Sequence, residues 1–94
     1  MKIIETENFK IRLKQIAIFI KQHNKQASIK FVKELKQQIN DLIFMPKKYR
    51  KSIYFDNENI RDIIFKGYTI VYFIDNNTIK ILDIFNQNLP HKDN

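Results

Sequence analysis

The chain has 94 residues but no cysteine, no tryptophan, one glycine and two prolines. The lack of cysteine excludes a disulfide scaffold and a thiolate metal site. The two histidines, His23 and His91, are far apart with no ligand-like spacing, so we expect no metal ion and no cofactor. No apolar run approaches the roughly 18 residues that span a bilayer, and charge interrupts the N-terminus by Glu5. We therefore expect a cytoplasmic protein with no membrane partner.

Apolar residues make up 44% of the chain, which is typical of a folded globular protein. We expect a single domain over residues 1–90, followed by a loose tail at residues 91–94. Seventeen Lys and Arg residues against ten Asp and Glu residues give a net charge of +7. This excess favours an acidic partner, and both nucleic acid and an acidic protein segment satisfy it.

The strongest local pattern lies between residues 60 and 86. Gly67 and Asn76 stand in two short polar breaks, where residues that tolerate positive φ favour tight hairpins. The breaks separate three runs rich in β-branched and aromatic residues, which are Ile60–Phe65, Tyr68–Ile74 and Ile79–Phe85. The pattern predicts a three-stranded antiparallel meander. Its middle strand is apolar on both faces and is therefore expected to be central in the sheet.

The N-terminal half predicts a short strand and two amphipathic helices. The strand covers residues 2–5, and Thr6 is suited to cap the first helix with its hydroxyl. A second helix is expected from near Lys25 to about Phe44, and Pro46 ends it because the residue before a proline is pushed out of helical geometry. Each helix carries one apolar stripe, at Phe9, Leu13, Ile16 and Ile20 in the first and at Phe31, Leu35, Ile39 and Leu42 in the second.

A basic stretch at residues 47–52 and a further short strand at residues 53–55 precede the meander. The complete order is β-α-α-β-β-β-β, which predicts a two-layer α+β domain. In this interpretation the sheet is antiparallel and the N-terminal helical hairpin covers one of its faces. The other face is expected to be open, either to bind a ligand or to be covered by a partner.

Several of these features occur together in one known group of proteins. Ile60-Arg61 precedes a Gly-Tyr-Thr-Ile-Val-Tyr stretch at residues 67–72, and a closing strand at residues 81–85 precedes Pro90. With Pro46 and the basic stretch around Arg50, this order resembles the RelE/ParE superfamily of bacterial toxins from type II toxin–antitoxin pairs. The resemblance implies a RelE/ParE-like fold and a small toxin that a cognate acidic antitoxin neutralises by direct binding.

The superfamily contains two activities. The RelE-like branch cuts messenger RNA on the ribosome, whereas the ParE-like branch poisons DNA gyrase. RNA cleavage needs a proton acceptor, a proton donor and cations on the phosphate. Here Arg61 keeps one cation, but its next neighbour on the same face is Ile63, and Thr69 follows Gly67-Tyr68. Asn86-Gln87-Asn88 ends the last strand without a residue that transfers protons near neutral pH, and only His91 lies close behind.

These departures favour the ParE-like branch and a toxin that acts by binding, so no catalytic residue is predicted. A RelE-like ribosome-dependent nuclease and a degenerate, non-toxic antitoxin-binding module stay as alternatives. Candidate target- or phosphate-binding residues are Arg50, Arg61, Lys66 and Lys80. Candidate antitoxin-binding residues are Phe9, Leu13, Tyr54 and Tyr72. Arg61 has a purely structural alternative, an ion pair with Asp62 or Asp83.

Overall fold

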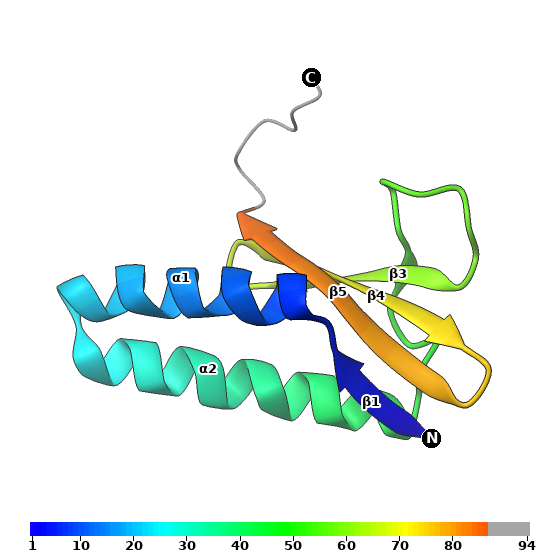
Figure 1. The fold of residues 1–94 in the computed structure, drawn as a ribbon, viewed down its shortest axis with the longest axis horizontal. Helices are drawn as coiled ribbons and strands as arrows, with labels where there is room; N and C mark the ends of the chain where they lie inside the picture. Colours follow the sequence, from blue (N-terminus) through cyan, green and yellow to red (C-terminus); the bar gives the residue numbers. More distant parts are fainter. Residues whose placement is uncertain (87–94) are drawn as a thin grey trace.

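The computed structural model describes residues 1–86 (Figure 1). Its elements are β1 (Lys2–Glu5), α1 (Glu7–His23), α2 (Lys25–Asn40), the 3₁₀ turn η1 (Asp41–Ile43), β2 (Arg50–Lys51), β3 (Ile60–Phe65), β4 (Tyr68–Asp75) and β5 (Thr78–Asn86). The five strands form one sheet in the order β1-β5-β4-β3-β2. The predicted α+β class and element order are confirmed. The tail predicted at residues 91–94 lies outside the described residues, as does the end of the domain predicted for residues 1–90.

The two helices form the expected antiparallel hairpin, and Figure 1 shows them side by side, α1 in blue and α2 in cyan to green. Thr6 caps α1 as predicted, because its hydroxyl accepts from the amide of Phe9 at 3.3 Å. Asn24 ends α1 and also caps α2, where its side-chain oxygen accepts from the amide of Ala27 at 3.0 Å. A single residue therefore reverses the chain. The predicted end of the second helix was too late, because the α-helix stops at Asn40 and tightens into the 3₁₀ turn before the proline.

The predicted meander is confirmed, with β4 between β3 and β5. Its first turn places Lys66 at φ 50° and Gly67 at φ 85°, and its second places Asn76 at φ 53°. These positive φ values explain the glycine and the asparagine at the two breaks. A bulge in β5 lies opposite Val71 and Tyr72, so the alternation of side chains shifts by one residue along that strand.

The expected antiparallel sheet is wrong in one pairing, because β1 runs parallel to β5 and makes the sheet mixed. β1 leads into α1 part-way along β5, where the amide of Thr6 donates to the carbonyl of Ile81 at 3.1 Å. The helix then continues toward the end of β5, so the strand that feeds it must run in the same direction. Local sequence carries no sign of this long-range pairing.

The strand predicted at residues 53–55 is also wrong, since the short strand β2 covers Arg50–Lys51 and ends before the predicted segment begins. β2 pairs with β3, and the amide of Ser52 closes that pairing on the carbonyl of Ile60 at 2.7 Å. The amide of the next residue, Ile53, donates to the carboxylate of Asp62 at 3.3 Å instead of to a backbone carbonyl of a neighbouring strand. Residues 52–59 therefore form a loop, which we call the cover loop.

The main core lies between the helical hairpin and the sheet, and it includes Phe9, Leu13, Leu35, Ile39, Ile63, Ile70, Tyr72, Ile79, Ile81 and Ile84. Strand alternation directs Asp62, Thr69 and Val71 to the opposite face, yet all three are buried. The cover loop lies over this face, where the rings of Tyr54 and Phe85 meet edge-to-face at 5.3 Å between centroids. The face that was expected to be open is therefore partly closed by the chain itself.

Candidate functional site

The most cationic feature of the described chain is the segment of residues 46–51, which we call the basic loop. It joins the end of the helical layer to β2 and carries Lys47, Lys48, Arg50 and Lys51. No acidic group of residues 1–86 forms an ion pair with Lys47 or Lys48, whereas Arg50 pairs with Asp62 and Lys51 pairs with Asp56. The loop therefore presents uncompensated positive charge on the surface.

Tyr72 anchors the start of the basic loop by a hydrogen bond. Its side chain is completely buried, and its hydroxyl donates to the carbonyl of Pro46 at 2.6 Å. Burial raises the pKa of Tyr72 to about 12, because the buried phenolate would lose its hydration. The phenol therefore remains a protonated donor throughout the physiological pH range, and the start of the basic loop stays tied to the centre of β4.

The raised pKa of Tyr72 predicts alkaline destabilisation. Because the folded pKa lies above the unfolded value of 10.0, the neutral phenol stabilises the fold fully below pH 10, and this stability is lost as pH rises toward about 12. Tyrosinate absorbance should show a late phase coupled to unfolding, and Tyr72→Phe should remove that phase. If the late phase persists in the variant, another group causes it.

Arg61 supports the same loop from β3. Its Nε donates to the carbonyl of Glu58 at 3.0 Å, and its Nη1 donates to the carbonyls of Tyr49 at 2.9 Å and Lys47 at 3.5 Å. The guanidinium thus satisfies backbone oxygens of both the basic loop and the cover loop. The structural alternative for Arg61 named an ion pair with Asp62 or Asp83, but within residues 1–86 its partners are backbone carbonyls and those two carboxylates pair with Arg50 and Arg12.

Asp62, the next residue of β3, serves the opposite face. Its Oδ2 lies 3.5 Å from Nη2 of Arg50 and accepts from the amide of Ile53 at 3.3 Å. Its other oxygen, Oδ1, is buried without a hydrogen-bond partner among residues 1–86. Successive residues of one strand therefore fix two loops, with Arg61 holding the basic loop and Asp62 joining it to the cover loop.

The remaining candidate cations lie elsewhere. Lys66 donates to Glu34 at 2.7 Å, and this hydrogen bond lowers the pKa of the Glu34 carboxyl. Lys80 pairs with Asp75 at 3.3 Å, at the opposite end of β4 from the Lys66 turn. Arg50 and Arg61 lie on paired strands but on opposite faces of the sheet, because Arg50 is level with Asp62 and Arg61 with Lys51. Lys66 and Lys80 lie apart from both.

The candidate antitoxin contacts have mixed positions. Phe9, Leu13 and Tyr72 are core residues, so a partner that docks on the folded chain would not touch them. Tyr54 is partly buried against Phe85. Sequence reasoning missed the exposed apolar residues outside the helical stripes, such as Ile11, Ile18 and Phe19 on α1 and Phe44 and Met45 after η1. The sequence could have indicated them, because they are apolar residues at positions that the helical period predicts to be exposed to solvent.

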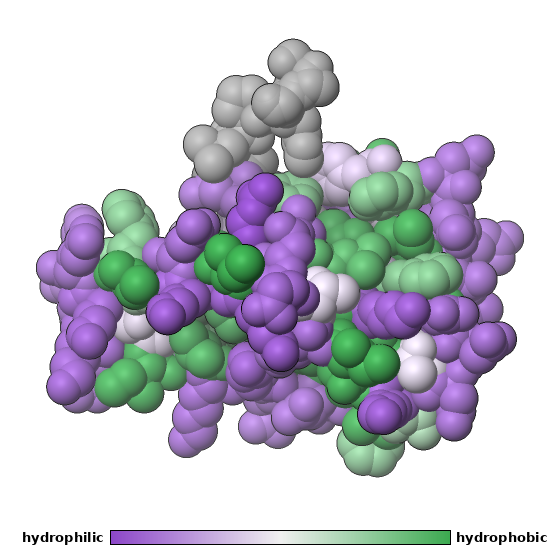
Figure 2. Space-filling model, in the orientation of Figure 1, coloured by the Kyte–Doolittle hydropathy of each residue, from purple (hydrophilic) through white to green (hydrophobic). Residues whose placement is uncertain are grey.

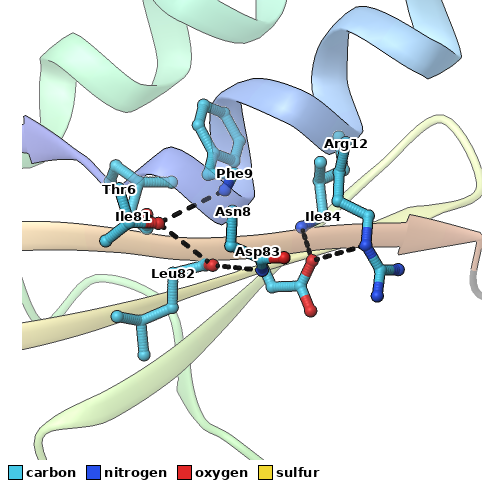
Figure 3. Close-up of polar contacts among 8 residues, drawn as sticks. All are labelled: Thr6, Asn8, Phe9, Arg12, Ile81, Leu82, Asp83 and Ile84. Carbon is cyan, nitrogen blue, oxygen red and sulfur yellow. Dashed lines mark hydrogen bonds and ion pairs between the residues drawn. The ribbon is translucent and has the colours of Figure 1, made fainter.

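A polar seam fastens the start of α1 to β5. Figure 3 shows Thr6, Asn8 and Arg12 directed toward that strand. Thr6 and Asn8 donate to the carbonyl of Leu82 at 3.2 and 2.9 Å, and Nε of Arg12 lies 3.8 Å from Oδ1 of Asp83 (Figure 3). A groove of about 290 Å³ continues from this seam and is lined by Arg12, Gln15, Ile16, Phe19, Tyr68, Ile84, Phe85 and Asn86.

Two of the positions where the sequence departs from the nuclease branch are buried. Ile63 is in the core, and Thr69 is completely buried with a hydroxyl that has no hydrogen-bond partner among the described residues. Gln87, Asn88 and His91 lie outside the described residues. Within residues 1–86 no group of three or more acidic or histidine side chains is placed to hold a metal ion, and no helix there is long and apolar enough to cross a membrane.

Comparison with known families decides the classification. The family described as the ParE toxin of the type II toxin–antitoxin system parDE matches residues 3–88. The chain belongs to the ParE toxin family. A search of curated proteins finds no significant match. Among solved structures, the chain is similar to one described as the chromosomal ParDE TA system from P. aeruginosa, with 15% sequence identity and a TM-score of 0.74. The alignment covers 92% of this chain and 95% of that one.

These matches confirm the ParE-like branch that the sequence favoured. At 15% identity the structural likeness concerns the fold, whereas the family match concerns the sequence itself. As a member of the ParE family, the chain is a toxin of a type II toxin–antitoxin system. In the described part of this ParE toxin, the basic loop combines positive charge with a backbone that hydrogen bonds from Tyr72 and Arg61 hold in place.

Proposed function

We propose that this ParE toxin inhibits growth by binding a type II topoisomerase, DNA gyrase, and that a cognate acidic antitoxin neutralises it. In this proposal the toxin performs no chemistry of its own. The observation that carries the proposal is the commitment of the sheet's arginines to the protein itself. Arg61 donates to backbone carbonyls and Arg50 pairs with Asp62, so both guanidinium groups already bind groups of the chain itself.

The buried Thr69 supports the same conclusion. It occupies the position after Gly67-Tyr68 and can supply neither charge nor access to a phosphate. RNA cleavage through a ribose 2′-OH requires cations that stabilise the developing charge, together with an acid and a base within hydrogen-bond reach. Residues 1–86 do not assemble such a set around Arg50 or Arg61. Binding to a macromolecular target needs no such set.

An antitoxin partner is supported by charge and by exposed apolar surface. The chain carries a net charge of +7, which suits an acidic partner. Ile11, Ile18 and Phe19 are exposed on α1, and Phe19 also lines the groove between α1 and β5. In Figure 2 green atoms appear as separate spots over the helices and gather more closely over the sheet. We propose that the antitoxin covers α1 and this groove, next to the predicted contacts Phe9 and Leu13.

Induction of the toxin alone tests the choice of target. We expect growth to stop, with double-strand DNA breaks and activation of the SOS response, because a trapped topoisomerase leaves cut DNA. The measurement pairs an SOS reporter with sequencing of messenger 5′ ends after induction. Coexpression of the acidic protein from the neighbouring reading frame is the control, and it should restore growth and co-purify with the toxin.

Two outcomes would replace the proposal. Rapid cleavage of messages on ribosomes without DNA damage would indicate the RelE-like nuclease activity. Normal growth despite abundant soluble protein would indicate a non-toxic antitoxin-binding module.

A further inference from the structure

Three large apolar side chains are exposed in succession where the helical layer ends. Ile43, Phe44 and Met45 have exposed fractions of 43%, 81% and 61%, and we call them the Phe44 tip. A run of three such residues in solvent is costly for a free protein, because each could be sheltered from water. Scattered apolar residues on a surface are ordinary, whereas a contiguous group next to charged residues marks an interaction site.

The backbone around the Phe44 tip is fixed on both sides. Leu42 is buried immediately before it, and the amide of Phe44 donates to the carbonyl of Asp41 at 3.1 Å. Immediately after it, the hydroxyl of Tyr72 holds the carbonyl of Pro46 at 2.6 Å. The tip is therefore presented by a rigid support, so a partner does not have to order this segment on binding. Such preorganisation favours tight association.

Positive charge and a hollow accompany the tip. Lys47 and Lys48 follow Pro46, and neither forms an ion pair with an acidic group of the described chain. The ammonium of Lys48 lies 5.4 Å from the centroid of the Tyr49 ring. Beside the two lysines lies a hollow of about 490 Å³ lined by Met1, Met45, Pro46, Lys47, Lys48 and Ile74. The surface thus combines exposed apolar side chains, an apolar hollow and two ammonium groups without an acidic partner in the described chain. An apolar centre with a charged rim is the usual anatomy of a protein–protein interface.

We propose that the Phe44 tip inserts into an apolar pocket with an acidic rim on the folded protein that this toxin attacks. A rigid, highly exposed aromatic side chain complements a concave, folded surface, and the adjacent lysines complement acidic groups around it. In the proposed function the acidic antitoxin instead covers the groove between α1 and β5. The inference rests on the proposed function, in which the toxin acts by binding its target.

The test compares two double variants of the whole chain. Phe44→Ala with Met45→Ala removes the exposed apolar side chains of the tip, and the matched control is Phe55→Ala with Ile53→Ala in the cover loop. Phe55 and Ile53 are also exposed, at 47% and 66%. We expect the tip variant to lose growth inhibition on induction and to bind purified gyrase roughly 10- to 100-fold more weakly, because two hot-spot side chains are gone. The control should behave like the parent chain.

Further readouts keep the interpretation specific. The tip variant should keep the parent's thermal unfolding midpoint and still co-purify with the acidic protein of the neighbouring reading frame. Unchanged growth inhibition by the tip variant would overturn the inference, as would loss of co-purification or an equal loss in the control. If the parent chain inhibits growth without binding gyrase, the proposed target fails. A tip variant that then loses inhibition still supports the tip as the target contact. A parent chain that does not inhibit growth overturns both.

Discussion

Replacing Phe9 with alanine is expected to lower the free energy of unfolding by roughly 3–5 kcal/mol. Phe9 has no exposed surface and lies in the core between α1 and the sheet. The loss combines the transfer free energy of the ring with the cost of the cavity that it leaves. Urea denaturation followed by circular dichroism measures the change, and the slope with denaturant should stay constant if the folded and unfolded states keep their compactness.

The matched control is Phe44→Ala, which removes the same ring from a position that is 81% exposed. Its effect on stability should stay within roughly 0.5 kcal/mol, because no cavity forms and little buried area is lost. The comparison separates the two roles of phenylalanine in this chain. Equal losses for Phe9→Ala and Phe44→Ala would mean that the tip is buried in solution, and the target-contact proposal would then lose its basis.

Replacing Arg61 with alanine should cost roughly 2–3 kcal/mol, since hydrogen bonds from a charged donor contribute about that much. Three carbonyls, of Glu58, Lys47 and Tyr49, would lose their donor, and both loops would lose a support. Water can replace part of this network because the site is only half-buried, so the expected loss is smaller than for Phe9→Ala. Urea denaturation gives the magnitude, and amide hydrogen exchange across residues 47–51 should accelerate.

Arg12→Ala is the control for the arginine result. Arg12 forms one exposed ion pair with Asp83 at 3.8 Å, and such a pair contributes at most about 1 kcal/mol. If Arg12→Ala and Arg61→Ala destabilise the chain equally, the carbonyl contacts of Arg61 contribute no more to stability than one exposed ion pair. If Arg61→Ala also weakens growth inhibition while Arg12→Ala does not, the support of the basic loop matters for the toxin's action.

Much of the fold was accessible to sequence reasoning because it depends on neighbours along the chain. The meander follows from three apolar runs and from positive-φ residues at Gly67 and Asn76. The first helix begins where the hydroxyl of Thr6 can accept a hydrogen bond from the nearby amide of Phe9. The two apolar stripes identify the helical layer. Each of these features is an interaction within a few residues, so composition and spacing are enough to predict it.

The predicted site was less accurate, because residue type does not reveal what a side chain bonds to. Arg61 looked like a cation for a phosphate, yet it bonds to carbonyls 3 to 14 positions away. Tyr72 looked like a contact for the antitoxin, yet it is a buried donor to Pro46, 26 positions away. Lys66 and Lys80 were grouped with the arginines by charge alone, and the hairpins carry them to opposite ends of β4.

The meander, the helical hairpin and the family resemblance were therefore contained in the local pattern of residues. The direction of β1, the position of β2 and the cover loop over Asp62 depend on partners across the whole sheet. There, hydrogen bonds to distant carbonyl or carboxylate oxygens select among locally equivalent conformations. The same holds for the basic loop. Its four cations are visible in the sequence, but their rigid display beside an exposed phenylalanine arises from Tyr72 and Arg61, which reach it only in the folded chain.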